Sequence, residues 1–171
     1  MNPLHNSSSS RALPAIFWAG FTCGVMDISA AFITWWPKGI APSRILKGIA
    51  SGLLGPQAYS GGTGIAALGL AFHFFIAFSA ATVFYLASRR LAFMTRRPVL
   101  SGISYGVAVY LVMYWIVMPL SRYRHRPFTV SSTIIAIVTH MICVGLPIAL
   151  IISRLCQDRT RLPGPYKAAH E

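Results

Sequence analysis

The chain has 171 residues, of which 55% are hydrophobic and 11% charged, and its mean hydropathy is +0.60. This composition lies outside the usage of soluble domains and is typical of an integral membrane protein. There are 15 Lys and Arg against 3 Asp and Glu, a formal net charge of +12, and the basic residues lie outside the apolar runs. That distribution favours anionic lipid head groups as partners. It argues against nucleic acid, because no folded basic module remains once the apolar runs are removed.

Four apolar runs are long enough to cross a hydrocarbon core, which needs about 20 residues. Backbone polar groups in lipid must be satisfied within the segment, and the alternation typical of barrel strands is absent, so each run is expected to be a helix. The predicted fold is an all-α, four-helix transmembrane bundle over residues 13–153, between a flexible tail (1–12) and a basic tail (154–171). The four predicted spans are residues 13–36, 64–88, 98–120 and 129–153.

The connection between the first two spans is the only long one, and its residues 43–54 show an amphipathic helical pattern. Ser43 is expected to cap this helix, and Gly55 and Pro56 are expected to end it. A helix of about 12 residues is too short to span the bilayer. Two interpretations stay open, an amphipathic helix lying in the membrane interface and a lid packed over the mouth of the bundle.

The other two connections are short and basic, so neighbouring spans are expected to be antiparallel. The side of the membrane that holds both termini carries nine Lys and Arg, and the opposite side carries six. This difference favours cytoplasmic termini. Six of the basic residues are expected to contact lipid head groups: Arg44, Lys47, Arg89, Arg90, Arg96 and Arg97.

Three ionisable residues lie inside the spans, and they are Asp27, His73 and His140. A carboxylate at bilayer depth costs about 2.5 to 3.5 kcal/mol on insertion scales, so Asp27 must face protein or water. With the spans as predicted, the three residues share a layer roughly 3 to 5 Å from the midplane. Each lies on the small-residue face of its helix, where helices approach closely. We therefore expect them to converge in a polar cluster inside the bundle.

Five glycines are expected at helix contacts: Gly20, Gly24, Gly69, Gly102 and Gly106. The first two form a small-xxx-small pattern, which allows close packing either within one chain or between two copies in a homo-oligomer. Four aromatic residues lie deep in the third span and are expected to pack between helices rather than to present their polar atoms to the interior. They are Tyr105, Tyr110, Tyr114 and Trp115.

The chemistry of the expected cluster has several interpretations. A hydrogen bond between Asp27 and an imidazole would hold the helices in register, as in a structural or partner-binding protein. The same groups would carry protons in a proton or ion conductor. His73 and His140 could instead be axial ligands of a haem b, or all three residues could form a metal centre. The first interpretation is favoured, so we expect no enzyme activity, no catalytic residue, no metal and no cofactor.

Four stretches of the sequence carry a resemblance to known proteins: RILKGIASGLLG, LGLAFHFFIAFSAATVFYLASRR, RRPVLSGISYGVAVYLVM and HMICVGLPIAL. Together they cover most of the chain between Gly20 and Leu150, and they resemble a group of small four-span bacterial inner-membrane proteins that is distantly similar to the YagU-like family. The resemblance implies a multi-pass protein of the bacterial cytoplasmic membrane, with a link to acid tolerance and so to envelope or pH homeostasis. It supplies no site residues.

Overall fold

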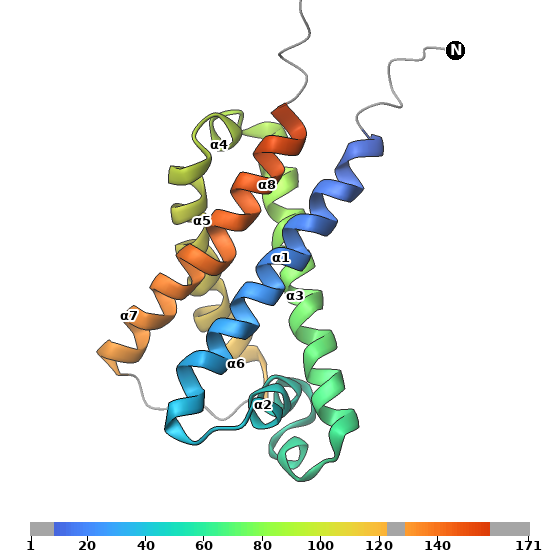
Figure 1. The fold of residues 1–171 in the computed structure, drawn as a ribbon, viewed down its shortest axis with the longest axis vertical. Coiled ribbons are helices and arrows are strands. Elements are labelled where there is room, and N and C mark those ends of the chain that lie inside the picture. The colour runs from blue at the N-terminus through green and yellow to red at the C-terminus, as the bar shows by residue number, and fades with distance from the viewer. Residues whose placement is uncertain (1–8, 123–128, 158–171) are drawn as a thin grey trace, which may run out of the picture.

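A computed structural model describes residues 9–122 and 129–157, and every regular element within these ranges is helical. Four helical segments are long and apolar enough to cross a membrane. The all-α class predicted from the sequence is therefore confirmed for the described residues, as is the presence of four helices able to span a membrane. Successive spans run in opposite directions, and the first and last helices reach the same end of the bundle (Figure 1). The four segments are Arg11–Lys38, Thr63–Arg90, Pro98–Leu120 and Val130–Leu155.

The first span is helix α1 (Ser9–Trp35), which continues into the 3₁₀ turn η2 (Trp36–Lys38). It begins four residues before the predicted start at residue 13, so the last part of the predicted flexible tail is helical. Gly39 ends the segment in the left-handed region, with φ of 73°. A glycine adopts this conformation without the steric cost that a side chain would bring.

The long connection contains helix α2 (Pro42–Leu54) and the 3₁₀ turn η3 (Pro56–Ser60). The predicted capping role of Ser43 is wrong, because α2 begins at Pro42 and Ala41 is its N-cap. Proline suits the first helical position, where its missing N–H leaves no bond unmade. Gly55 ends α2 with φ of 78° and Pro56 follows, as expected from the sequence.

The second span is helix α3 (Thr63–Arg90), followed by the short helix α4 (Phe93–Arg96). The third span is α5 (Pro98–Val112), η4 (Met113–Val117) and α6 (Met118–Leu120), and the fourth is α7 (Val130–Thr139), η5 (His140–Gly145) and α8 (Leu146–Gln157). The basic loop at residues 123–128 and the tail from residue 158 lie outside the described residues.

Spans three and four each contain a π-helical segment, η4 and η5, just before a proline. Pro119 follows η4 by two residues, and Pro147 follows η5 by the same interval. Proline lacks an N–H and its ring crowds the preceding turn. A wider turn relieves that crowding, and local π adjustments are one way in which membrane helices accommodate proline. The presence of Pro147 indicates a break in the hydrogen-bond ladder, but the sequence does not indicate that the turn before it is π-helical.

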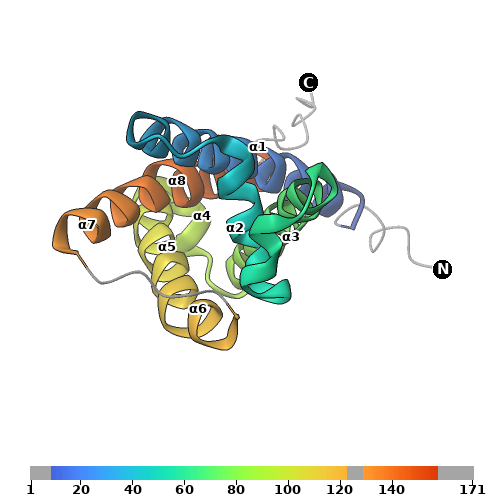
Figure 2. The ribbon, with the colours of Figure 1, turned by 90° about the horizontal axis from the view of Figure 1, so that it is seen from below.

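The helices form an open ring in which α1 packs between α3 and α8, while α5 packs on α8 and η5. Helices α3 and α5 make almost no close backbone contact with each other. Helix α2 crosses one end of the bundle and packs against α3 (Figure 2). Most of the buried side chains lie in the half farther from α2, where Phe84 and Ile148 are fully buried. The half near α2 is less completely filled.

Glycines create the closest helix contacts. On α1, a side chain at Gly20 would overlap the ring of Phe78, and one at Gly24 would lie 2.7 Å from the ring of Phe74. Two aromatic side chains of α3 thus fill the notches that the two glycines leave in α1. The small-xxx-small face predicted from the sequence is occupied within the chain.

The other predicted packing glycines lie against backbone rather than against side chains. Gly102 and Gly106 on α5 face η5, where a side chain at Gly145 would overlap the Gly102 carbonyl oxygen. Gly69 on α3 faces the carbonyl group of Leu46 on α2 in the same way. Backbones that meet without intervening side chains allow α5 to approach η5, and α2 to approach α3, at the short distances typical of small-residue interfaces in membranes.

Candidate functional site: a polar layer and an end cavity

His73 links α3 to α1 through a hydrogen bond to the main chain. Its Nε2–H donates to the carbonyl oxygen of Gly24 at 2.8 Å. The imidazole also lies edge-on to the neighbouring Phe74, with ring centroids 5.6 Å apart. A carbonyl oxygen has a second lone pair, so Gly24 can accept this bond in addition to its bond within α1. His73 is therefore at the level of Gly24, one helical turn from Asp27.

His140 is the first residue of η5 and hydrogen-bonds within its own span. Its Nδ1–H donates to the Ala136 carbonyl oxygen at 2.8 Å, and its ring lies edge-on to Tyr110 of α5, at 5.6 Å between centroids. Tyr110 stacks in turn on Tyr114 at 5.9 Å. These contacts join the start of η5 to α5 through aromatic packing, with the polar ring atom satisfied locally.

Asp27 is half-buried on α1 and lies near two thiols, those of Cys23 on the preceding turn and Cys143 in η5. Within residues 9–122 and 129–157 its carboxylate makes no hydrogen bond and no ion pair. The expected hydrogen bond between Asp27 and an imidazole is thus not formed. Both histidines bond to main-chain carbonyls instead: His73 to Gly24 across the contact of α3 with α1, and His140 to Ala136 one turn earlier in its own span.

The positions of Asp27, His73 and His140 also decide whether they are placed to bind a metal ion or a haem. Among the described residues, no group of three or more His, Cys, Asp or Glu side chains is placed to hold a metal ion, so Asp27, His73 and His140 do not form the metal centre considered above. An axial haem ligand would be the Nε2 atom of each imidazole. In His73 that atom already donates to Gly24, so haem binding would require this bond to break.

The aromatic residues of the third span divide into two groups. Tyr105 packs edge-on against Phe84 at 5.0 Å, and its hydroxyl donates to the Ala80 carbonyl oxygen of α3 at 2.7 Å. This residue joins α5 to α3 where their backbones are not in contact. Trp115 is 69% exposed on the outer wall, so the prediction that it packs between helices is wrong.

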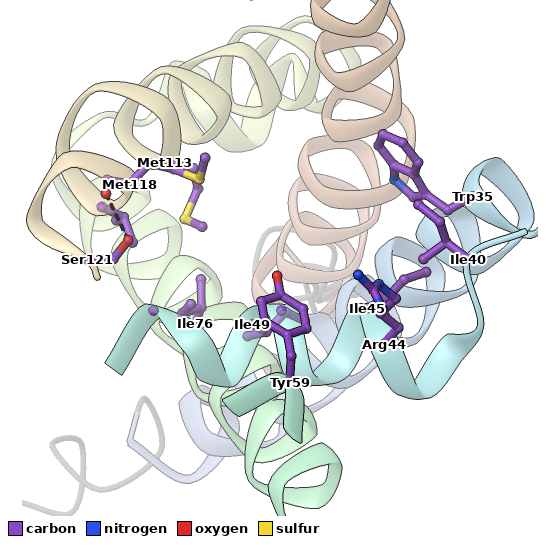
Figure 3. Close-up of a pocket in the computed structure, with 13 residues that line it drawn as sticks. Trp35, Ile40, Arg44, Ile45, Ile49, Tyr59, Ile76, Met113, Met118 and Ser121 are labelled. Atoms are coloured by element: carbon purple, nitrogen blue, oxygen red, sulfur yellow. Dashed lines mark hydrogen bonds between the residues drawn. The ribbon is translucent and has the colours of Figure 1, made fainter. Parts of the chain in front are cut away.

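A cavity of about 340 Å³ lies at the α2 end of the bundle (Figure 3). Its walls come from the end of α1, from α2, η3, α3, η4 and α6. Most of the lining is apolar, including Ile76 of α3 and Met113 of η4, and three polar side chains join it, those of Arg44, Tyr59 and Ser121. In Figure 3, Met113 lies on the wall opposite Arg44.

The cavity exists because α2 presents glycines to it. Gly48 and Gly52 both line the cavity, and a side chain on Gly52 would come no nearer than 3.5 Å to Ser121. Helix α2 is held in place on both sides, by its contact with Gly69 of α3 and by a bond from the Arg122 N–H to the Gly52 carbonyl oxygen at 2.8 Å. This arrangement agrees with the lid interpretation of the connection.

Sequence reasoning missed this cavity, although α2 carried a signal. Gly48 and Gly52 are four residues apart, and they share the lining with Ile45 and Ile49. Two glycines on the side of an amphipathic helix that faces the bundle leave space where larger side chains would fill it. The far wall could not be inferred, because it depends on how α3 and α5 separate.

Comparisons with protein-family models, with curated proteins and with solved structures found no match. The resemblance to the YagU-like group stays a prediction from the sequence.

Proposed function

We propose that this protein is a multi-pass protein of the bacterial inner membrane with a structural or partner-binding role and a link to envelope or pH homeostasis. The observation that supports the role is the bond from His73 to the Gly24 carbonyl oxygen. It uses the polar atom of a half-buried imidazole to tie two spans together, as polar side chains do between membrane helices. A direct proton relay between Asp27 and His73 would need a hydrogen bond between them, and His73 is bonded to Gly24 instead.

The test compares Asp27→Asn, His73→Phe and the parent chain in two assays. In detergent, His73→Phe should lower the free energy of unfolding by about 0.6 to 1.7 kcal/mol, the range for interhelical hydrogen bonds in membranes. In liposomes with an internal pH dye, the parent and Asp27→Asn should both leak protons at the rate of empty vesicles. Proton flux in the parent that Asp27→Asn abolishes would overturn the structural role.

One observation favours a proton or ion conductor as the second candidate. The Asp27 carboxylate is only half-buried, has no hydrogen bond among the described residues and lies near Cys143 of the π-helical segment η5. Ionisable residues inside membranes often mark ion pathways, and π-helical segments occur frequently at functional sites. The liposome assay distinguishes the candidates, because a conductor loses flux with Asp27→Asn while its unfolding free energy changes little.

We further propose that the end of the bundle with α4 faces the cytoplasm. Six basic residues among those described lie exposed at this end, against three exposed and one half-buried at the α2 end, and the positive side of a membrane protein is usually cytoplasmic. The six are Arg11, Arg89, Arg90, Arg96, Arg97 and Arg154. Four of these, together with Arg44 and Lys47 on α2, are proposed to contact anionic head groups, which would place α2 at the opposite membrane interface.

Fusions at the C-terminus test this orientation. Green fluorescent protein attached after Glu171 should fluoresce, because it folds in the cytoplasm, and alkaline phosphatase at the same position should be inactive. The reverse pair of results would contradict the proposal. A homo-oligomer remains a proposal as well, but it would need a surface other than Gly20 and Gly24, which Phe78 and Phe74 cover.

A further inference from the structure

The size and lining of the cavity indicate a small, largely apolar ligand. Its volume of about 340 Å³ lies at the lower end of the range of about 300–1,000 Å³ found for ligand pockets. Ile49, Ile76 and the two methionines Met113 and Met118 supply apolar surface. Methionine side chains adapt to ligands of irregular shape. One hydrocarbon chain fits this space better than the two chains of a phospholipid.

A cationic group stands at the same cavity. Arg44 of α2 is exposed to solvent while it lines the cavity, and its guanidinium lies over the ring of Tyr59 at 5.5 Å. Within the described part of the chain the only carboxylate is that of Asp27 on α1, and it makes no ion pair, so Arg44 is not neutralised by a protein acid there. Guanidinium groups bind carboxylates and phosphates through paired hydrogen bonds. The cavity therefore joins an apolar interior to an anion-binding rim.

We propose that the cavity binds a single-chain amphiphile with an anionic head, of the fatty-acid type. The head contacts Arg44 and the chain extends across the cavity toward Met113 on the opposite wall (Figure 3). Gly48 and Gly52 make room for the chain beneath α2. This site is independent of Asp27, His73 and His140, and it adds a ligand-binding role to the proposed structural one.

Trp35 lines the cavity and can report on binding. The three other tryptophans are exposed by more than half of their surface, so Trp18→Phe, Trp36→Phe and Trp115→Phe together leave Trp35 as the sole indole with little change to the core. The probe is ω-bromo-undecanoate, because bromine quenches indole fluorescence at contact. We expect saturable quenching of Trp35 in detergent-solubilised full-length protein, reversed by unbrominated dodecanoate.

Three variants test the site. Gly52→Leu should abolish the saturable quenching by filling the cavity, whereas Gly64→Leu, where an added side chain meets nothing within 4 Å, should leave it unchanged. Arg44→Gln should weaken binding of the carboxylate about tenfold, the effect of losing a charge-assisted hydrogen bond. It should not change binding of the uncharged ω-bromo-undecanol. Since Arg44 is exposed, this variant stays informative even if Gly52→Leu fails to fold, which thermal unfolding would show.

The outcomes separate the proposal from its rivals. Equal quenching of the parent and a folded Gly52→Leu would show that the probe reaches Trp35 from the micelle, and would overturn the cavity site. Equal affinity for the acid and the alcohol in the parent would overturn the anionic class. Quenching by brominated phosphatidylglycerol but not by the fatty acid would assign the cavity to a membrane phospholipid instead. None of these results depends on the liposome flux that tests the role of Asp27.

Discussion

Replacement of Gly145 by alanine tests one of the two closest helix contacts among the described residues. The new Cβ would overlap the carbonyl oxygen of Gly102 and would lie 2.6 Å from the backbone nitrogen of Gly106. Both neighbours are main-chain atoms of α5, so no side chain can rotate away and the two spans must separate. Overpacking of this kind costs about 1 to 3 kcal/mol and sometimes more. Alanine gains at most about 1 kcal/mol over glycine in helix propensity, so the net effect is destabilising.

Gly52→Ala is the matched control, because it makes the same chemical change inside a helix. There the added Cβ would lie 3.5 Å from the Cβ of Ser121, an ordinary van der Waals contact, so the propensity gain should dominate. Unfolding of both variants in mild detergent, followed by circular dichroism during titration with a denaturing detergent, should place Gly145→Ala at least 1 kcal/mol below Gly52→Ala. If Gly145→Ala were as stable as the control, the close approach of α5 to η5 would be wrong.

Three further substitutions can be measured in the same unfolding assay. Gly69→Ala should lower the free energy of unfolding more than Gly24→Ala does, because the Leu46 carbonyl cannot move aside whereas the Phe74 ring can. Equal losses of stability in the two variants would argue against a rigid contact between α2 and α3. Tyr105→Phe should lose about 0.6 to 1.7 kcal/mol with its bond to the Ala80 carbonyl, and an unchanged midpoint would mean that the hydroxyl finds another partner. Trp115→Ala should change stability by less than about 0.5 kcal/mol, as expected for an outward-facing side chain, and a larger loss would place this ring in an interface.

The polar groups inside the spans illustrate how local acceptors compete with distant ones. From the sequence, a carboxylate and two imidazoles at one depth are expected to hydrogen-bond to each other. That expectation assumes that the main-chain groups of each helix accept no further hydrogen bond. In the folded chain a carbonyl oxygen still has a free lone pair, and a glycine exposes it. His73 reaches Gly24 for this reason, and His140 reaches Ala136. Asp27 remains beside Cys23 and Cys143 without a hydrogen bond among the described residues.

Pro119 near the end of the third span and Pro147 within the fourth are a second case in which packing decides the local geometry. A proline inside a helix interrupts the backbone ladder, because it has no N–H. Whether the helix then kinks, ends or forms a wider turn depends on what packs against it. Close contact of Gly102 and Gly106 with η5 accompanies the π-helical turn in the fourth span.

The sequence by itself determined the class of protein and the number of spans, since length and hydropathy decide which segments can be satisfied in lipid as helices. It also identified the glycines at helix contacts, because only small residues let backbones approach. Which groups those glycines face was decided by the tertiary structure: Phe74 and Phe78 for α1, main-chain atoms for α5. The cavity beneath α2 was also decided by the tertiary structure. Its volume depends on the separation of α3 from α5, which no local pattern in either helix encodes, because it results from how all the spans pack together.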